Sequence, residues 1–352
     1  MSGRRRWVAA LTMTVLALGA CTSTVPREAA DPTVVATPTV TETPTPEPEP
    51  TPEPTWPLTG LPLGDAAGDG PALAVKVENT AMARPQTGLE DADVVWEEMV
   101  EGGITRFNAV FHSHLPEVVG PIRSVRPMDA GIVAPLGGPQ VISGGQPLFL
   151  SSVQAEGVQI ISNDAGHAGF FRSGERRAPH NLYGRPADFL LQAAATEPPP
   201  EQFRFAVPPE VATAVGGGEP AAAVRLRFPQ TSPSWTWDAG TQRWLRDEAG
   251  TPSTSAAGEV LAAENVVVLR VRIVASAGRD QAGNAVPETV MTGEGEALVA
   301  SGGRTVAATW SKPTTADPVT LRTADGQDVT LVPGTTWVEL VPADRGGVDV
   351  VR

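Results

Sequence analysis

The sequence predicts an α+β protein in which a mixed α/β domain is followed by a smaller, mainly β domain. Between residues 57 and 195, apolar runs of strand length alternate with segments of helical spacing. Beyond residue 202, alternating or β-branched runs are separated by glycine, aspartate and asparagine turns. Three consecutive prolines in "TEPPPEQ" end any regular element, so we expect a linker at residues 196–202 between domains at 57–195 and 203–345.

The first twenty-one residues predict an export signal and a lipid anchor. Three arginines precede an apolar run that is too short to span a bilayer comfortably and that ends at Cys21. The end of this run, "LGAC", is similar to the lipobox of bacterial lipoproteins, in which the cysteine becomes the lipid-modified first residue. We therefore expect a signal peptide at residues 1–20, acyl chains such as palmitate on Cys21, and a mature protein held on the outer face of the bacterial cytoplasmic membrane.

Residues 21–56 predict a disordered spacer. They consist largely of threonine, proline, glutamate, valine and alanine, without the apolar periodicity from which a core could form. At about 3 Å per residue in polyproline II, such a segment reaches roughly 100 Å from the membrane. This reach suits a crowded cell envelope. The partners expected there are the lipid bilayer, contacted through Cys21, and a cell-wall component or a membrane protein.

The charge of the chain argues against nucleic acid as a partner. Loss of residues 1–20 removes three arginines and no acid, so the formal net charge falls from −14 to −17. A strongly acidic protein is repelled by a phosphate backbone. The single cysteine excludes a disulfide within one chain, so the folded part depends on ordinary cores.

Individual elements follow from short runs. In the first domain, "ALAVKVEN", "PQVISGG" and "GVQIIS" predict strands, "PLFLSSVQAEG" and "RPADFLLQAAA" predict helices, and "AMARPQTGLEDA" predicts a loop or short helix. In the second domain, the expected strands lie in "AVRLRF", "SWTWDAGTQRWLR", "NVVVLRVRI", "ALVASGGRTVAATW" and "VTLRTADGQDVTLVPGTTWVELV".

A β-hairpin is predicted over residues 94–111, "VVWEEMVEGGITRFNAVF". Gly102 and Gly103 fit a two-residue turn, whose positive φ glycine adopts without strain. One face then carries Glu97, Met99, Glu101, Ile104, Arg106 and Asn108, and the other carries Trp96, Glu98, Val100, Thr105, Phe107, Ala109 and Phe111. We expect the second face to pack on the core, with Glu98 half-buried at its edge. A slip of one residue would exchange the faces.

The charged face of this hairpin has two interpretations. Glu97 and Glu101 can act as an acid and a base, as two carboxylates flanking a substrate do in glycan cleavage. Alternatively, both pair with Arg106 across the strands and fix the register. From the hairpin alone the ion-pair interpretation is favoured, because such cross-strand pairs are common.

Downstream arginines suggest an anion site. "VVGPIRSVRPMD" places Arg123 and Arg126 on either side of Ser124, with a proline available as an early helical position. "GFFRSGERRAPHNLYGR" adds Arg172, Arg176, Arg177, His180, Asn181 and Arg185. Guanidinium groups bind carboxylate or phosphate through paired hydrogen bonds, and a helix start adds N–H donors. Each arginine alone could equally pair with one of the protein's own carboxylates, whereas a convergent cluster would bind an anion.

Neither a metal nor a cofactor is predicted. His112 and His114 alternate at a strand end, but two ligands are too few for a metal site. Taken alone, His180 is more typical of a structural histidine than of a catalytic base. The sequence also contains no recognisable nucleophile elbow, metal signature or phosphate-binding loop.

The tryptophans of the second domain have two interpretations as well. Trp235 and Trp237 alternate along one strand, and Trp244 follows the next turn. An exposed row of indoles could stack on a sugar. A β domain poor in phenylalanine and tyrosine needs large apolar side chains inside, which favours a hairpin core.

Several spaced motifs resemble one family. "ARPQTGLEDADVVWEEMVEGGITRF", "VGPIRSVRP" and "RAPHNLY" are similar to the N-terminal domain of the YerB-like bacterial lipoproteins. "NVVVL", "TGEGEALVASGGRTVAATWSK" and "LVPGTTWVEL" are similar to the smaller C-terminal β domain of that family. The resemblance covers residues 57–343 and implies a signal peptide, a lipid anchor, a spacer and two extracytoplasmic domains of unknown function. It implies no established reaction.

The family pattern, carried over by position, covers Arg84, Pro85, Glu97, Glu101, Gly102, Thr105, Arg106, Gly120, Pro121, Arg123, Ser124, Arg126, Pro179, His180 and Asn181. Glu98 falls where the pattern varies, including to apolar residues. Ser143-Gly144-Gly145 stands where other members often carry a histidine before the glycines, so a role for that histidine does not transfer to this chain.

The leading functional hypothesis is a non-enzymatic envelope lipoprotein that recognises an anionic or polar ligand, or a protein. The residues expected to make contact are Glu97, Glu101, Thr105, Arg106, Arg123, Ser124, Arg126, Arg172, Arg177, His180 and Asn181. The alternative is a hydrolase or transferase of cell-wall glycan or peptide, with Glu97 or Glu101 as base and His180 as acid. A third possibility is a scaffold that docks on a membrane complex without a ligand pocket.

Overall fold

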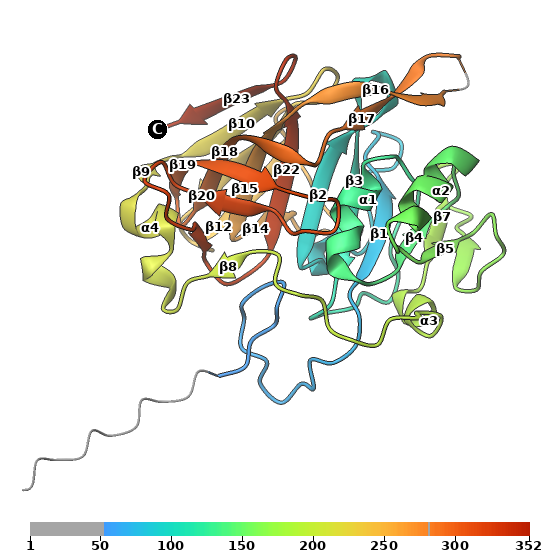
Figure 1. The fold of residues 1–352 in the computed structure, drawn as a ribbon, viewed down its shortest axis with the longest axis horizontal. Helices are drawn as coiled ribbons and strands as arrows, with labels where there is room; N and C mark the ends of the chain where they lie inside the picture. Colours follow the sequence, from blue (N-terminus) through green and yellow to red (C-terminus); the bar gives the residue numbers. More distant parts are fainter. Residues whose placement is uncertain (1–52, 281) are drawn as a thin grey trace, which may run out of the picture. The chain divides into compact units, whose positions relative to one another are not determined.

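The computed structural model describes residues 53–280 and 282–352, which belong to one compact unit, Pro52–Arg352 (Figure 1). The predicted signal peptide, Cys21 and residues 21–52 of the spacer lie outside the described residues. Within the described part, no helix is both long enough and apolar enough to cross a membrane.

An eleven-stranded mixed sheet runs through this unit in the order β20-β19-β18-β15-β22-β2-β3-β1-β4-β5, with β9 paired to β19 (Figure 1). Its strands are β1 (Leu73–Glu78), β2 (Val94–Met99), β3 (Thr105–Phe111), β4 (Gln140–Ile142), β5 (Ile160–Ser162), β9 (Glu219–Pro220), β15 (Asn265–Val271), β18 (Gly293–Ser301), β19 (Arg304–Lys312), β20 (Thr320–Arg322) and β22 (Thr336–Pro342). Because β2 pairs with β22 in parallel, strands from both sides of the predicted linker share this sheet.

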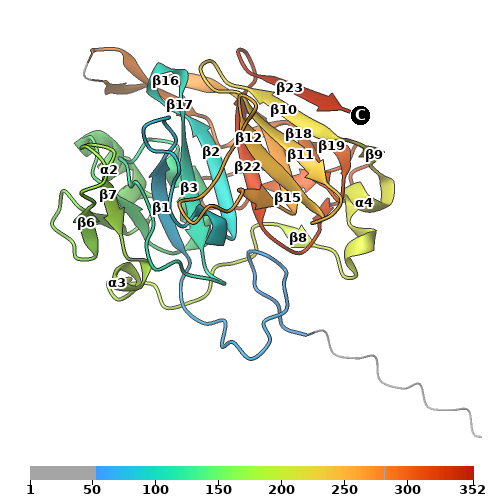
Figure 2. The same ribbon diagram turned by 180° about the vertical axis from the view of Figure 1, so that it is seen from behind.

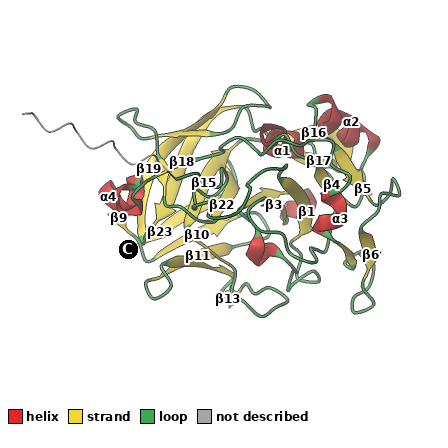
Figure 3. Cartoon of the chain, turned by 90° about the horizontal axis from the view of Figure 1, so that it is seen from below, coloured by secondary structure: helices red, strands yellow, loops and turns green. Residues whose placement is uncertain are grey.

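A second sheet of six strands packs on one face of the first, which we call the sheet face (Figures 2 and 3). It contains β10 (Ala223–Arg227), β11 (Pro233–Asp238), β12 (Arg243–Glu248), β13 (Thr251–Pro252), β14 (Ala262–Ala263) and β23 (Gly347–Val351). Trp235 of β11 meets Trp337 of β22 between the two sheets, with ring centroids 5.1 Å apart. Burial of large aromatic rings at this junction is a main source of its stability.

Two helices, α1 (Asp129–Val133) and α2 (Pro147–Ala155), cover the opposite face, which we call the helix face. Ile132 of α1 and Phe149 of α2 join Trp96 and Val110 of the sheet in one buried cluster. The other helices are α3 (Pro186–Leu190) and α4 (Thr213–Gly217), with 3₁₀ turns η1 (Leu89–Asp91), η2 (Glu101–Gly103), η3 (Ala134–Leu136) and η4 (Pro209–Val211).

Three two-stranded ribbons complete the fold: β6 (Phe170–Arg172) with β7 (Leu182–Gly184), β8 (Arg204–Phe205) with β21 (Thr330–Leu331), and β16 (Ile273–Arg279) with β17 (Ala285–Thr289). Short helices alternate with strands before residue 196 and strands dominate after it, which confirms the α+β class. The helix expected in "RPADFLLQAAA" is shorter than predicted. Its last residues form turns, in which the Gln192 side chain donates to the carbonyls of Asp188 and Ala168.

The tryptophans of the second domain form a core. Trp235 and Trp244 are fully buried, and Trp237 packs against Trp244 with 5.3 Å between ring centroids. The Trp235 indole N–H donates to Glu339 Oε1 at 2.8 Å. The core interpretation of these residues is therefore confirmed, and they do not present an exposed row of indoles to a sugar.

Candidate functional site

The β2–β3 hairpin differs from the prediction by one residue of register. Its loop contains three residues, Glu101 to Gly103, and closes where the Val100 N–H donates to the Ile104 carbonyl at 2.8 Å. Both glycines have positive φ, as expected. The longer loop pairs Glu98 with Arg106 and Met99 with Thr105. The predicted two-residue turn was therefore wrong, and Arg106 lies on the face of Glu98 rather than that of Glu97.

Glu97 does not belong to an exposed charged face. It is fully buried on the sheet face, where its Oε2 accepts from Arg246 at 2.7 Å and its Oε1 accepts from Thr105 at 2.6 Å. Asn79 adds a donor at 3.2 Å. Since every neighbour of this carboxylate is internal, the structure separates Glu97 and Thr105 from the other predicted site residues.

Glu98 is also fully buried, on the helix face, where the prediction placed it only at the edge of the core. Its carboxylate contacts the Lys76 ammonium, which also donates to Asp129 Oδ1 at 2.6 Å. The other oxygen of Asp129 accepts the backbone N–H of Arg126 at 2.8 Å. Burial and, after it, the charge of Asp129 raise the pKa of Glu98 to about 8, although the charge of Lys76 opposes the shift. The buried group of Lys76, Glu98 and Asp129 therefore holds the backbone of Arg126, in the loop that carries Arg123 and Arg126.

Three arginines line an open hollow of ≈ 950 Å³ on the helix face, beside the hairpin turn. We call it the arginine cleft. Its lining consists of Val100, Glu101, Ile104, Arg106, Arg123, Ser124, Arg126, Gly145, Gln146, Pro147, Asp164, Pro179, Arg279, Asp280 and Ala282. Strand β3 supplies Arg106, and the loop before α1 supplies Arg123 and Arg126.

Arg106 is the most buried of the three, with only 7% of its surface exposed. One of its terminal nitrogens donates to the Ser124 carbonyl at 3.0 Å. Within the described residues, no carboxylate lies within 4 Å of its guanidinium group. Burial, together with the charges of Arg126 and Arg123, lowers the pKa of Arg106 to about 9. The Arg106 guanidinium group is therefore still charged at neutral pH, although burial and the two neighbouring arginines disfavour its charge.

The other two arginines are paired. Arg126 binds Glu101 through two parallel contacts, Nε to Oε2 at 2.8 Å and Nη2 to Oε1 at 2.6 Å. Burial raises the pKa of Glu101, but hydrogen bonding and charge from Arg126 outweigh it and leave the pKa below its usual value. Arg123 Nε lies 3.6 Å from Glu78, whose other oxygen is 2.8 Å from His180 Nδ1. His180 thus adjoins the cleft through Glu78.

The remaining predicted contacts lie elsewhere. Arg172 donates to the Asn181 side chain at 2.8 Å and braces the β6–β7 ribbon. Arg177 is exposed, and its carbonyl accepts the His180 N–H. The structure therefore brings together Glu101, Arg106, Arg123, Ser124 and Arg126, with His180 beside them.

Sequence reasoning missed Lys76 and Glu78, which support the site from β1. Both lie in the run "ALAVKVEN", and their even spacing puts them on one face of the strand. Charged residues on a strand whose other residues are apolar, as in a buried strand, indicate an internal polar network. That signal was present, but it does not reveal which distant carboxylates or arginines complete the network.

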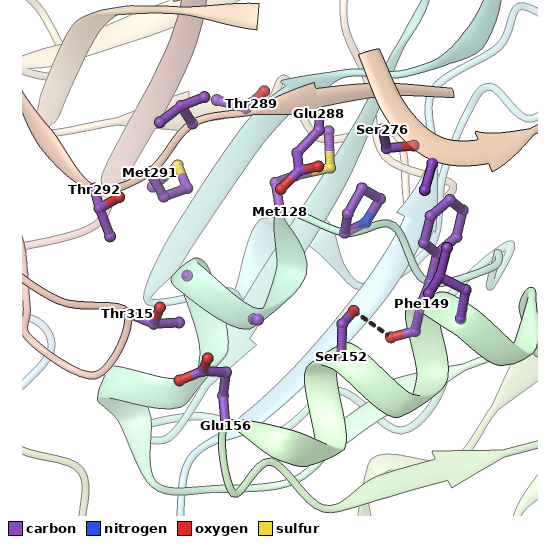
Figure 4. Close-up of a pocket in the computed structure, with 16 residues that line it drawn as sticks. Met128, Phe149, Ser152, Glu156, Ser276, Glu288, Thr289, Met291, Thr292 and Thr315 are labelled. Atoms are coloured by element: carbon purple, nitrogen blue, oxygen red, sulfur yellow. Dashed lines mark hydrogen bonds between the residues drawn. The ribbon is translucent and has the colours of Figure 1, made fainter. Parts of the chain in front are cut away.

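A smaller hollow of ≈ 360 Å³ lies between α1, α2 and the β16–β17 ribbon (Figure 4). Met128, Phe149 and Met291 give it an apolar wall, and Glu156 and Glu288 stand on either side. These carboxylates would repel an anion. We therefore take the arginine cleft as the candidate site.

Two family models match the chain: "Protein of unknown function (DUF3048) N-terminal domain" over residues 58–199 and "Protein of unknown function (DUF3048) C-terminal domain" over residues 224–338. The chain belongs to the YerB-like family. A relative from Bacillus subtilis (strain 168), described as "Putative lipoprotein YerB", is 26% identical over 300 residues, which cover 81% of this chain and 86% of the relative.

The crystal structure of YerB from Bacillus subtilis has the same fold as this family member. The TM-score is 0.70 at 24% identity, and the match covers 84% of this chain and all of the YerB chain. The resemblance expected from the short motifs is therefore confirmed for the family and for the fold.

Proposed function

We propose that this YerB-like protein is a non-catalytic envelope lipoprotein that binds an anionic ligand in the arginine cleft. The observation that carries the proposal is Arg106, a buried guanidinium group crowded by two others and without a carboxylate partner among the described residues. An unpaired buried charge lowers the stability of a fold. A bound anion would compensate that charge.

The surroundings of Arg106 support recognition of an external ligand rather than an internal ion pair. Glu101 already binds Arg126 through two parallel contacts, and Glu78 lies between Arg123 and His180 and contacts both. These pairs hold the two flanking arginines in place. Among the described residues, Arg106 donates only to the Ser124 carbonyl, which leaves its other N–H groups available to a ligand in the cleft that it lines. Rigid, paired side chains around a guanidinium group with free donors are typical of a binding site.

Titration calorimetry tests the proposal on the chain from residue 22 onward, which retains the compact unit Pro52–Arg352. We expect saturable binding of at least one of phosphate, sulfate and acetate, and loss of most of the affinity in Arg106→Met. Arg177→Met, which changes an exposed arginine outside the cleft, should bind like the wild type. Equal affinities of the wild type and Arg106→Met would remove the basis of the proposal.

The geometry gives the hydrolase or transferase alternative less support. Glu97 lies on the opposite face of the sheet from the cleft, where Arg246 and Thr105 occupy its oxygens. Glu101 is held by Arg126, and a carboxylate whose pKa is lowered is a weaker base at neutral pH. Incubation with purified cell wall checks this directly, and release of soluble fragments that stops with Glu101→Gln would favour the enzyme.

Attachment to the membrane through Cys21 is part of the same proposal. It is supported by the export signal in the sequence and by a relative described as a lipoprotein. When cells that express the protein are grown with labelled palmitate, we expect the wild-type chain to incorporate the label. Cys21→Ser should lose both the label and its association with the membrane. A Cys21→Ser protein that stays in the membrane fraction would contradict this anchor.

A further inference from the structure

The arginine cleft has a second wall, made by the turn that leads into α2. Gly145, Gln146 and Pro147 line the same cleft as the three arginines. Within the described part of the chain, no acceptor bonds the backbone N–H of Gly145 or of Gln146. These amides stand at the start of a nine-residue helix, where unpaired N–H groups and the helix dipole favour an anion.

Gly145 lets this turn lie close to the segment that carries Arg123 and Arg126. A Cβ atom on Gly145 would come within 2.4 Å of Val125 Cγ1. The Val125 N–H donates to the Gly144 carbonyl at 3.0 Å, and the hydroxyls of Ser124 and Ser143 are 3.2 Å apart. The two walls are therefore fixed against each other by packing and by hydrogen bonds.

We infer that the arginine cleft binds a phosphoryl group, held by Arg106, Arg123 and Arg126 on one side and by the amides of Gly145 and Gln146 on the other. This inference rests on the proposed anion-binding function and specifies its ligand. A phosphoryl group projects oxygens tetrahedrally and accepts donors from two walls at once, whereas one guanidinium fork can satisfy a planar carboxylate. Arg106 is the independent sign of a missing anion, because it is buried, lines the cleft and has no carboxylate within 4 Å among the described residues.

The charges of the lining favour a phosphodiester over a more highly charged phosphate. The lining contains four arginines and three acids, namely Arg106, Arg123, Arg126, Arg279, Glu101, Asp164 and Asp280. Glu78, which pairs with Arg123 but is not part of the lining, offsets the remaining positive charge, so a singly charged phosphodiester suits the cleft better than a doubly charged phosphate. The hollow of ≈ 950 Å³ is much larger than one phosphate, so the phosphoryl group belongs to a larger molecule, either a soluble glycerophosphate polymer or a lipid headgroup.

A matched pair of variants at Gln146 tests the second wall. The backbone of Gln146 has φ −67° and ψ 139°, which proline adopts without strain. Gln146→Ala and Gln146→Pro both lose the side-chain bond to the Arg279 carbonyl, and only Gln146→Pro also loses the N–H. With dimethyl phosphate as probe, we expect Gln146→Pro to bind about tenfold more weakly than Gln146→Ala, as loss of a hydrogen bond to a charged group predicts.

Further measurements keep the inference testable if Gln146→Pro does not fold. On titration of the wild type with dimethyl phosphate, the amide NMR signals of Gly145 and Gln146 should shift, and acetate should bind at least about tenfold more weakly. Acetate binding as tight as phosphate binding, with those amides unmoved, would overturn the phosphoryl inference and leave anion binding intact. Absence of binding by every anion would overturn both.

The same assay distinguishes the two sources of the phosphoryl group. Poly(glycerol phosphate) that binds in solution, while vesicles of phosphatidylglycerol do not, supports an envelope polymer. Binding to the vesicles by protein that lacks an acyl chain supports a lipid headgroup. If neither the polymer nor the vesicles compete with dimethyl phosphate, the assignment to a larger phosphodiester fails.

Discussion

Arg106 and Arg246 are both buried, yet their surroundings give them opposite roles. Burial lowers the pKa of Arg246, but the charges of Glu97, Glu339 and Glu248 outweigh it and raise the pKa overall. Its guanidinium group donates to Glu97 at 2.7 Å and lies over the Phe107 and Trp337 rings. Arg106 instead faces two other arginines. We infer that Arg246 stabilises the fold and that Arg106 serves the ligand.

The two arginines predict opposite changes in stability. Arg246→Met leaves the Glu97 carboxylate buried without its cation, so we expect the free energy of unfolding to fall by about 3–5 kcal/mol. Arg106→Met removes an unfavourable charge and should leave the free energy of unfolding unchanged or higher. Urea denaturation near pH 7 measures both. A large loss of stability in Arg106→Met would show that Arg106 is structural.

Glu98 predicts a dependence of stability on pH. Its pKa is raised to about 8 by burial, whereas an unfolded glutamate titrates near ~4.3. The folded state keeps a proton that the unfolded state releases, so the free energy of unfolding falls as pH rises from about 4.5 to about 8. Glu98→Gln should flatten this decline without abolishing it, because burial also raises the pKa of Glu339. Urea titrations at about pH 5, 7 and 8.5 compare the slopes.

A control separates this effect from a general loss of carboxylates. Glu288→Gln changes a glutamate in the wall of the smaller hollow and should keep the wild-type slope. Equal slopes in the wild type and Glu98→Gln would mean that Glu98 is ionised throughout the range.

Among single residues, the sequence predicted Glu101 and three arginines of the cleft, but it misplaced Arg172, Arg177, Glu97 and Glu98. Arg106, Arg123 and Arg126 could be predicted because glycine, proline and serine flank them in short motifs. The position of Glu97 could not, because it depends on a one-residue difference in loop length. Its partner Arg246 lies 149 residues away along the chain, and no local pattern joins the two.

Among the elements, the hairpin turn shows why its register was ambiguous. A two-residue and a three-residue loop both use glycines at positive φ, so Gly102 and Gly103 are compatible with either. In the structure, Gly103 packs against Pro229, and a Cβ atom there would lie 2.8 Å from the Pro229 Cβ. Strand β22 pairs along β2 from Val94 to Glu97. These distant contacts decide the register.

This turn predicts a graded series of alanine variants. Gly102 has φ 72° and open space around it, so Gly102→Ala should lower the free energy of unfolding by about 1–2 kcal/mol through backbone strain alone. Gly103→Ala adds the contact with Pro229 and should lower it further. Gly174→Ala, at a glycine with open space and no positive φ, should be nearly neutral. Equal losses in the three variants would refute this account.

For the whole molecule, the two family segments share one interior. Strand β2 pairs with β22, Glu97 binds Arg246, and Arg84 lies 3.3 Å from Glu248. The sequence predicted a change from mixed α/β segments to strands near residues 196–202, because consecutive prolines and alternating strands are recognisable from the local sequence. Parallel pairing between distant strands leaves no such pattern, so the continuous sheet could not be predicted.

The shared interior predicts that neither segment folds alone. Residues 53–202 would expose the open edge of β2 and a buried carboxylate without its arginine. We expect each of 53–202 and 203–352 to unfold without a cooperative transition, and co-expression to restore a single transition in thermal circular dichroism. Sharp, separate transitions of the isolated segments would show two independent domains.

Strand β22 follows every other strand of the eleven-stranded sheet along the chain, yet it lies between β15 and β2 in the middle of that sheet. One edge of β15 and one edge of β2 therefore stay unpaired until β22 has been synthesised. The strands β5-β4-β1-β3-β2 and the strands β20-β19-β18-β15 form two part-sheets, and only β22 joins them. The two parts of the sheet can consequently become one only late in synthesis, when β22 is available to both.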